Sequence, residues 1–379
     1  MKALLLSAYD AESHRVWREN LCAMLPQIDW TTLTLPPRYF PWRVRGNSLS
    51  WAFNHRPALS DNYDFLLCTS MTDLSALRGF VPALARLPTI VYCHENQFAY
   101  PENPDPQATR TNPVEPRILN LYTALCADRL VFNSTWNQRS FLEGAAALLR
   151  KLPDQVPAGL VERLSASRVL PVPLDPTLFQ PRPAITEPDV LTLVWNHRWE
   201  YDKGPALLLA IVDALLARGT RFRLHLLGQH FRQTPPEFAL VQHRLAAWSA
   251  SSGISAGVTG YLEDAAAYRA VLAASDVVLS TALHDFQGLA VQEACALGCA
   301  PLTPDTLVYP EYLGAESLYA GSGSLTEQAA SAATRLADWA ARKRAGSELP
   351  RASMEAFHPR SLQAGYTELI HALFSHPSS

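Results

Sequence analysis

The chain has 379 residues, more than one hydrophobic core normally holds, and this length predicts two domains. Hydrophobic residues make up 48% of the chain and charged residues 18%, which excludes a disordered protein. The formal net charge of −3 excludes capture of nucleic acid by the field of the whole molecule, so an RNA contact requires a local patch.

The opening residues 1–7 are apolar, but they are too few for a signal peptide or for the roughly 20 residues of a membrane span. Asp10 and Glu12 follow at once, so we interpret this segment as a first buried strand. The six cysteines contain no C-x-x-C pair, which is typical of reduced thiols in core positions. These features predict a cytoplasmic protein without a membrane partner.

Short runs rich in valine, leucine and isoleucine alternate with stretches of helical periodicity. In the first half they predict strands at residues 3–7, 33–35, 65–70, 89–93, 130–133 and 169–172. Continuous apolar strands separated by helices are typical of a parallel sheet that is covered on both faces. The turn after the first strand has no glycine, which argues against a dinucleotide-binding fingerprint and a dehydrogenase.

Between Asp29 and Asp61 the chain has no acidic residue, and arginines alternate with aromatic residues. The arginines are Arg38, Arg43, Arg45 and Arg56, and the aromatic residues are Tyr39, Phe40, Trp42, Trp51 and Phe53. Such a segment is suited to hold phosphates and to stack an unpaired base. A partly buried aromatic hairpin with solvated arginines is an equal alternative, and His14 is compatible with either role. Arg43, Arg45 and His14 are therefore candidate acceptor-binding residues.

A polar segment, H-E-N-Q at residues 94–97, directly follows the predicted strand 89–93 and projects from its carboxyl end. Glu95, Asn96 and Gln97 are candidates to bind an acceptor or to stabilise the loop. A His-Glu pair also suggests a metal, but no third or fourth ligand follows at a suitable spacing, so we predict no metal site.

Closely spaced prolines between residues 171 and 188 predict an extended connector, because proline is excluded from the interior of helices and sheets. The second half repeats the α/β pattern. Strands are predicted at residues 191–195, 222–228, 258–262, 277–281 and 300–303, and helices at 206–218, 265–274 and 325–344. We predict two doubly wound Rossmann-like domains facing a cleft, at residues 1–183 and 184–355, with residues 356–379 packing back toward the first.

The segment W-N-H-R-W-E-Y-D-K-G-P at residues 195–205 lies between a predicted strand and a predicted helix. Arg198 and Lys203 are close enough to converge on one anion beside the helix N-terminus. A nucleotide diphosphate requires such a pair, because negative charge accumulates on the leaving phosphates as the glycosidic bond breaks. The alternative is a surface ion pair of Arg198 with Glu200 or Asp202.

A second constellation starts at the end of the strand 277–281 and enters a helix. Asp285 and Glu293 are separated by seven residues, so both can face one cleft, where carboxylates accept hydrogen bonds from sugar and ribose hydroxyls. A solvated helix carboxylate is the alternative for Glu293. The remaining candidate donor-binding residues are Asn196, Phe286, Gln287, Gly288 and Leu289.

These two segments resemble the retaining glycosyltransferases of the GT-B architecture, whose donor site combines an Arg…Lys pair with an E-x7-E motif. Here Asp285 replaces the first glutamate. A narrower likeness, over nearly the whole chain, is to the tRNA-queuosine mannosyltransferase family. The most similar segments are residues 92–97, 100–101, 195–203, 284–293 and 308–311, together with 66–79 and 128–134. A run such as N-H-R-W-E-Y-D-K is too specific for chance.

The resemblance implies a GT-B fold, GDP-mannose as donor, and the queuosine base of a tRNA anticodon as acceptor. It implies transfer with retained anomeric configuration, in which the departing phosphate helps to deprotonate the acceptor, with no cofactor and no metal. It also places His94 near the donor sugar. Arg198, Lys203, His94 and Asp285 are therefore the predicted catalytic residues.

Two other readings of the chain stay open. One is a GT-B enzyme that uses another nucleotide sugar and a glycan or lipid acceptor, although we see no basic amphipathic helix that would favour a lipid. The other is a catalytically silent module that binds sugar or RNA. The presence of Arg198, Lys203 and Glu293 disfavours the silent module, and the replacement at Asp285 favours it.

Overall fold

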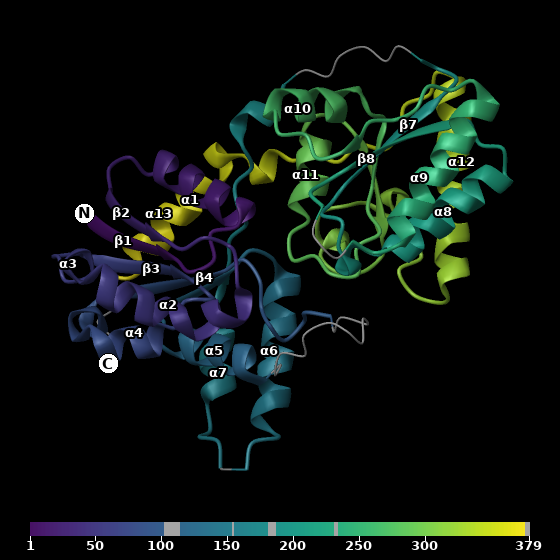
Figure 1. Cartoon of the computed structure of the whole chain (residues 1–379). Helices are drawn as coiled ribbons and strands as arrows, with labels where there is room; N and C mark the ends of the chain where they lie inside the picture. Colours follow the sequence, from purple (N-terminus) through teal and green to yellow (C-terminus); the bar gives the residue numbers. More distant parts are fainter. Residues whose placement is uncertain (102–113, 154, 181–186, 231–233, 376–379) are drawn as a thin grey trace. The chain divides into compact units, whose positions relative to one another are not determined.

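The chain folds into two compact units, each built around its own parallel sheet (Figure 1). The computed structural model describes residues 1–101, 114–153, 155–180, 187–230 and 234–375. The first unit comprises Met1–Asp175 and Glu355–Ser379, and the second comprises Pro176–Met354. Both ends of the chain therefore belong to the first unit, and the second is inserted between them.

The first sheet has six parallel strands in the order β2-β1-β3-β4-β5-β6. They are β1 (Lys2–Ser7), β2 (Asp29–Thr34), β3 (Phe65–Thr69), β4 (Thr89–Cys93), β5 (Arg129–Phe132) and β6 (Arg168–Val169). Strands β3 and β4 are buried at every position, because helices cover both faces of the sheet. This burial explains their continuous apolar sequences.

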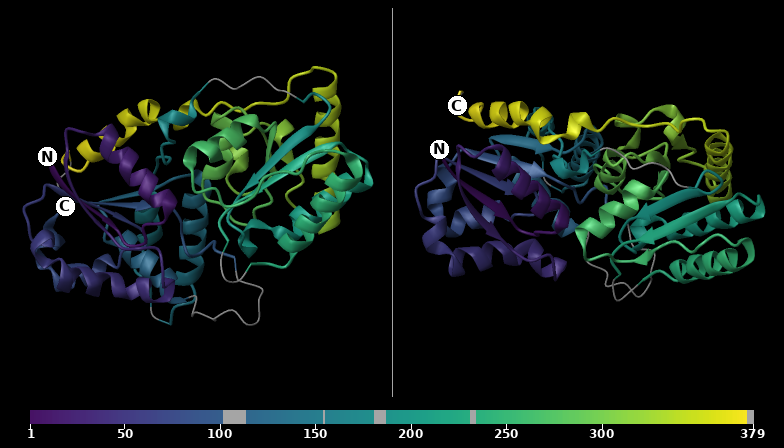
Figure 2. Two further views of the ribbon diagram at one scale, coloured as in Figure 1. Left: turned by 45° about the horizontal axis from the view of Figure 1, so that its top comes forward. Right: turned by 90° about the horizontal axis from the view of Figure 1, so that it is seen from above.

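One face of this sheet is covered by α1 (Glu12–Met24) and α13 (Pro359–His371), and the other by the remaining helices of the unit (Figure 1). These are α2 (Phe40–Asn54), α3 (Arg56–Leu59), α4 (Leu74–Phe80), α5 (Val114–Leu125), α6 (Thr135–Leu149) and α7 (Leu160–Ser165). Figure 2 shows α13, in yellow, beside α1. The α13 residue Tyr366 accepts a 3.1 Å hydrogen bond from Trp17 Nε1 and donates one of 2.9 Å to Pro171 O, so the last helix completes this core.

The second sheet has the order β12-β11-β10-β7-β8-β9. Its strands are β7 (Leu191–Asn196), β8 (Phe222–Leu227), β9 (Thr259–Gly260), β10 (Val277–Leu279), β11 (Ala300–Pro304) and β12 (Leu318–Tyr319). Helices α8 (Pro205–Ala217), α9 (Glu237–Ser252) and α12 (Leu325–Arg344) lie on one face, and α10 (Ala265–Ala274) and α11 (Leu289–Ala296) lie on the other (Figure 1).

Helix α12 begins and ends where its sequence indicates. Ser324 and Glu327 form a capping box at its start, and its last turn contains three basic residues, which favour the negative end of the helix dipole. One of them, Lys343, is buried and donates to Asp276 Oδ2 at 2.5 Å and to Val190 O at 2.7 Å. This ion pair fixes α12 to the amino ends of β7 and β10.

Every predicted strand position contains a strand, which confirms the doubly wound α/β fold. The strand predicted at residues 169–172 begins one residue earlier and ends at Val169, because Pro171 and Pro173 lack the N–H groups that a sheet needs. β12 was not predicted. No helix among the described residues is long and apolar enough to cross a bilayer.

Candidate active site

Two loops at the carboxyl ends of the neighbouring strands β7 and β10 carry the predicted donor residues. Hydrogen bonds join the loops directly: Leu283 N donates to Asp202 O at 2.8 Å, and Thr281 Oγ1 donates to Lys203 O at 2.8 Å. Trp195, near the end of β7, donates from Nε1 to the same Thr281 Oγ1 at 2.9 Å. Two motifs that are about 85 residues apart in sequence therefore form one structural site.

Gly204 allows this close approach of the loops. It lies in the left-handed region with φ of +64°, and a Cβ atom on it would stand 2.0 Å from Thr281 O. Only glycine fits such a position. Pro205 follows as the first residue of α8, where its missing N–H costs no hydrogen bond. The glycine thus brings the loop and the helix N-terminus against the second loop.

The two predicted cations meet at the carboxylate of Asp202, which is buried. Lys203 Nζ lies 3.2 Å from Asp202 Oδ2, and Arg198 Nη2 lies 3.6 Å from the same oxygen. Arg198 Nη1 also lies 2.5 Å from Glu200 Oε2. This is the ion pair that the sequence left open as the alternative. The side chain of Arg198 nevertheless remains 45% exposed, whereas Lys203 is buried.

Lys203 also connects the cations to the acidic loop, since its Nζ donates to His284 O at 2.7 Å. The next residue, Asp285, accepts hydrogen bonds from Gly288 N at 3.1 Å and from the Tyr309 hydroxyl at 3.0 Å. Burial alone would raise the pKa of the Asp285 carboxyl, but the charge of Lys203 and the hydrogen bond from Tyr309 lower it, and the net shift is downward. Asp285 is therefore ionised at neutral pH.

Gly288 is the N-cap residue of α11, and its backbone lies in the left-handed region with φ of +75°. A Cβ atom at this position would stand 2.6 Å from the Tyr312 hydroxyl and 3.0 Å from the Tyr309 ring. The short turn between Asp285 and α11 thus depends on glycine, and it aims the N–H groups of the first turn of α11 at the same edge as Asp285.

Glu293 is the second predicted acid and lies in the second turn of α11. Its Oε2 accepts a 3.2 Å hydrogen bond from the hydroxyl of Tyr268 in α10. Asn196, the last residue of β7, donates from Nδ2 to that hydroxyl at 2.9 Å and to Ala290 O at 2.9 Å. The carboxylate of Glu293 is therefore anchored, and it is not the freely solvated helix residue of the alternative.

His197 and His284 flank the cations, and both side chains are buried. Burial, followed by the charge of Lys203, lowers the pKa of each to about 4. Both rings are therefore neutral at pH 7 and add no charge to that of Arg198 and Lys203. The sequence motif contained these histidines, but nothing in it assigned them a protonation state.

The other predicted donor residues line the turn into α11. Phe286 and Gln287 are buried and Leu289 is half-buried. Gln287 Nε2 donates to Gln292 Oε1 at 2.9 Å, and the Phe286 ring lies edge-on to the ring of His284, with the centroids 4.4 Å apart. Their side chains therefore pack the turn into α11.

In the first unit, His94 follows β4 and lies against His14 of α1, with ring centroids 4.1 Å apart. Trp17 and Tyr92 complete this buried aromatic cluster, at 4.7 and 4.8 Å from the His94 ring. Burial lowers the pKa of His14 to about 4 and lowers that of His94 well below its usual value. Both predicted histidines are thus brought together as neutral rings at the carboxyl edge of the sheet.

Asn96 supports the loop that carries His94. Its side chain is fully buried, its Nδ2 donates to Asn137 Oδ1 and Ser140 Oγ at 2.9 Å, and its Oδ1 accepts from Phe98 N and Ala99 N at 3.0 Å. With both ends of its amide engaged, Asn96 stabilises the loop, which was one of its two predicted roles. It is not placed to contact an acceptor.

The neighbouring Glu95 and Gln97 are held by their backbones and keep partly exposed side chains. Glu95 O accepts from Ser70 Oγ at 3.1 Å, and Gln97 N donates to Asn120 Oδ1 at 2.8 Å. These two side chains remain candidates for acceptor contacts.

The arginine-rich segment does not form the aromatic hairpin considered as an alternative, because residues 40–54 form helix α2. Arg43 is buried and donates to Pro36 O at 3.3 Å, so its guanidinium holds the start of α2 and does not face solvent. Arg45 is exposed but contacts two carboxylates, Asp73 at 3.3 Å and Glu115 at 2.5 Å. The fold thus supplies acids that the local sequence lacks.

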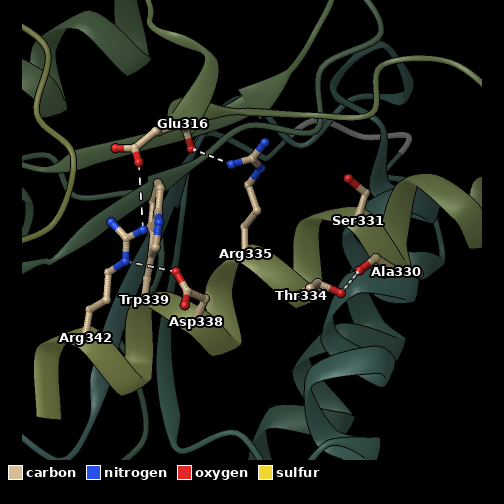
Figure 3. Close-up of a pocket in the computed structure, with 8 residues that line it drawn as sticks. All are labelled: Glu316, Ala330, Ser331, Thr334, Arg335, Asp338, Trp339 and Arg342. Carbon is tan, nitrogen blue, oxygen red and sulfur yellow. Dashed lines mark hydrogen bonds and ion pairs between the residues drawn. The ribbon is translucent and has the colours of Figure 1, made fainter. Parts of the chain in front are cut away.

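Neither a metal cluster nor the hollow along α12 offers a competing site within the described residues. Among the described residues, no group of three His, Cys, Asp or Glu side chains is placed to hold a metal ion. A shallow hollow of about 620 Å³ lies along α12 (Figure 3). There, Arg342 pairs with Asp338 at 2.9 Å, and Arg335 donates to Glu316 O at 3.3 Å. Its charged groups satisfy one another and are remote in sequence from the two donor loops.

The fold as a whole matches solved glycosyltransferase structures. Anabaena HepE in complex with UDP and glucose aligns with a TM-score of 0.60 at 15% identity, covering 98% of this chain and 100% of that chain. Sucrose-phosphate synthase from Thermosynechococcus elongatus aligns with a TM-score of 0.66 at 13% identity, covering 99% and 100%. At these identities the likeness establishes the GT-B fold.

Sequence comparison identifies the family. Residues 2–174 match the family described as tRNA-queuosine alpha-mannosyltransferase N-terminal. The tRNA-queuosine alpha-mannosyltransferase of Drosophila melanogaster is 30% identical over 336 residues, which cover 86% of this chain and 85% of the relative. The chain therefore belongs to the tRNA-queuosine alpha-mannosyltransferase family and is a glycosyltransferase of the GT-B fold.

Proposed function

We propose that the protein transfers mannose from GDP-mannose to the queuosine base of a tRNA, with retention of the anomeric configuration. Membership of the family and the name of the Drosophila relative support this choice of donor sugar and acceptor. One contact carries the proposal: the hydrogen bond from Lys203 to the carbonyl of His284 joins the cationic loop to the loop of Asp285.

The donor is assigned to the edge that β7 and β10 share. Lys203 and Arg198 bind the diphosphate, together with the N–H groups that open α11. Asp285, which is ionised, accepts from hydroxyls of the mannose, and Glu293 accepts from the ribose. Asn196 and Tyr268 hold Glu293 in place. Arg198 is the more exposed member of the pair, and we assign its side chain to a phosphate that replaces Glu200 as its partner.

In the reaction, the bond between mannose C1 and the phosphate oxygen breaks, and a bond from the acceptor hydroxyl oxygen to C1 forms on the same face. The hydroxyl proton passes to the departing phosphate oxygen, and GDP leaves. Lys203 and Arg198 stabilise the charge that grows on this phosphate. No enzyme nucleophile is assigned, and the diphosphate charge is neutralised without a metal.

His94 is assigned to the mannose hydroxyls, with His14 packed against its ring. A neutral imidazole suits this role, because it offers one donor and one acceptor nitrogen and does not compete with the cations for the diphosphate. All six cysteines are free thiols, which is consistent with a reducing compartment, and we place the reaction in the cytoplasm.

The test is incubation of the full chain with labelled GDP-mannose and with tRNA that either contains or lacks queuosine. Labelling of the queuosine tRNA alone supports the proposal. Donor hydrolysis without labelled RNA, or labelling with UDP-glucose in place of GDP-mannose, would show a different acceptor or donor. Absence of nucleotide-sugar binding in a calorimetric titration would indicate a silent binding module.

A further inference from the structure

Helix α2 carries an exposed stripe that the core does not use. Trp42, Arg45, Leu49 and Phe53 are three or four residues apart and fall on one line along the helix. Trp42, Leu49 and Phe53 are 52%, 46% and 65% exposed. We call these four residues the α2 stripe.

The opposite side of α2 already provides the packing of the helix. Trp51 is fully buried there, Asn47 donates to Met71 O at 3.1 Å, and Ser48 donates to Asp73 Oδ2 at 3.3 Å. The α2 stripe therefore does not contribute to the packing of α2 against the sheet. Exposed large apolar side chains gathered on one line are uncommon on a protein surface and indicate binding.

The stripe continues beyond the helix on both sides. Tyr39, just before the helix, is 74% exposed, and Arg38 lies over its ring, with Cζ 6.0 Å from the centroid. At the far end, Phe80 of the neighbouring helix α4 meets Phe53 edge-on, with ring centroids 5.7 Å apart. Aromatic rings thus stand at both ends of the stripe, about 22 Å apart, the length of a 15-residue helix.

The charge along this surface is positive at both ends. Arg38 precedes the stripe and Arg56 follows it, both are exposed, and neither has an ion pair within the part of the chain that the structure describes. Arg45, in the middle, is neutralised by Asp73 and Glu115. Both ends of the surface therefore offer aromatic rings together with a cation, and the centre, with Leu49 and the paired Arg45, adds no net positive charge.

The N-terminal end of the stripe lies at the catalytic edge of its unit. Leu35 N donates to Ser7 O at the carboxyl end of β1, and Phe40 packs edge-on against Tyr9 of the next loop, with ring centroids 5.8 Å apart. His14 and His94 stand at this same edge, since the carboxyl ends of parallel strands coincide. The surface therefore leads away from the edge where the acceptor reacts.

We propose that the α2 stripe, with Arg38 and Arg56, binds unpaired nucleotides of the acceptor tRNA next to the modified base. Aromatic side chains stack bases of any sequence, and flanking arginines hold the phosphates between them. This inference rests on the proposed function, because it takes the acceptor to be RNA. A membrane is the less suitable occupant, since an interfacial helix needs a broad apolar face and here that face is one residue wide.

The test uses the full chain and measures binding of queuosine tRNA by filter retention, separately from catalysis. Trp42→Ala combined with Phe53→Ala removes two stacking faces without touching the core. We expect the Kd for tRNA to rise by at least about thirtyfold, because two stacking contacts are lost. The Kd for GDP-mannose should stay unchanged. Phe374→Ala, an exposed aromatic residue in the same unit, is the matched control and should bind tRNA as the wild type does.

Arg38→Gln with Arg56→Gln tests the charge independently. Removing two phosphate contacts should flatten the plot of log Kd against log salt by about 1.4, at roughly 0.7 for each contact to a single strand. Arg218→Gln, an exposed arginine of the second unit, should leave the slope unchanged. Thermal melting checks that each variant is folded.

Unchanged tRNA affinity in both double variants would overturn the inference. So would wild-type binding to phosphatidylserine vesicles that Trp42→Ala with Phe53→Ala abolishes while tRNA affinity stays constant. Failure of the proposed function has a different signature: the wild-type protein then transfers no label to queuosine tRNA, whatever the stripe variants do.

Discussion

The hydroxyl of Tyr268 in α10 donates a 3.2 Å hydrogen bond to the carboxylate of Glu293 in α11, and it accepts one of 2.9 Å from Asn196 at the end of β7. These hydrogen bonds connect β7, α10 and α11 at Glu293, the acid that we assign to the ribose. Burial, followed by the charge of Glu293, raises the pKa of Tyr268 well above its usual value, so the hydroxyl stays protonated and donates throughout the physiological pH range.

Tyr268→Phe is expected to weaken donor binding. It removes the donor that orients Glu293 and leaves Asn196 Nδ2 with Ala290 O alone, a loss of about 1–1.5 kcal/mol or roughly tenfold in affinity. The KM for GDP-mannose should rise by this factor, with kcat little changed. Tyr63→Phe, which also removes a tyrosine hydrogen bond, is the control, and an equal rise in that variant would refute the assignment.

Lys203→Ala is expected to reduce the rate of transfer by about 10²–10³, because one fixed cation is lost from the leaving group. It should also lower the free energy of unfolding by about 3 kcal/mol, since the buried Asp202 keeps only Arg198. Chemical denaturation and single-turnover kinetics measure the two effects. Adding Asp202→Asn should restore stability but not transfer. Recovery of transfer in the double variant would remove Lys203 from the diphosphate site.

Gly204→Ala and Gly219→Ala form a matched pair. The two glycines have φ values of +64° and +65°, but a Cβ atom meets Thr281 O at 2.0 Å in the first and nothing within 4 Å in the second. Gly219→Ala should therefore cost about 1–2 kcal/mol of stability and leave catalysis intact. Gly204→Ala should cost more and abolish transfer, because the two donor loops must separate. Similar activity in the two variants would show that this loop contact is dispensable.

The free energy of unfolding should fall with acid between pH 6.5 and 4. The pKa values of His14, His197 and His284 are lowered to about 4 by burial, so within this window the unfolded chain binds protons that the folded chain does not. Each histidine contributes up to about 1.4 kcal/mol per pH unit to the slope of the free energy of unfolding against pH. Above pH 6.5 this contribution to stability is fully present. Urea denaturation across this range tests the slope, and His14→Gln should make it shallower.

The sequence predicted the sheets well because buried parallel strands are apolar at every position. The helix at residues 40–54 was not predicted, because the buried side of α2 contains Arg43, Asn47 and Ser48. These polar residues are satisfied by Pro36 O, Met71 O and Asp73, and such distant partners cannot be seen in a local pattern. Helical periodicity of apolar residues was therefore hidden.

In the candidate site, too, local motifs could be predicted from the sequence, and contacts between distant residues could not. Arg198, Lys203, Asp285 and Glu293 stand in two local motifs, from which the sequence alone predicts them as site residues. Tyr268 and Tyr309 were given no role, since each is about 25 residues from the acid that it contacts and only the fold brings them together. The sharing of Asp202 by both cations also depends on the turn at Gly204.

Because α13 packs on the first sheet, the two units are completed in a fixed order during synthesis. Residues 176–354 leave the ribosome as an uninterrupted unit, whereas the first 175 residues must wait for Tyr366 before Trp17 Nε1 and Pro171 O gain their partner. Domains generally mature from the N-terminus onward as translation proceeds. In this protein the second unit is complete first, and the unit that begins the chain is completed last.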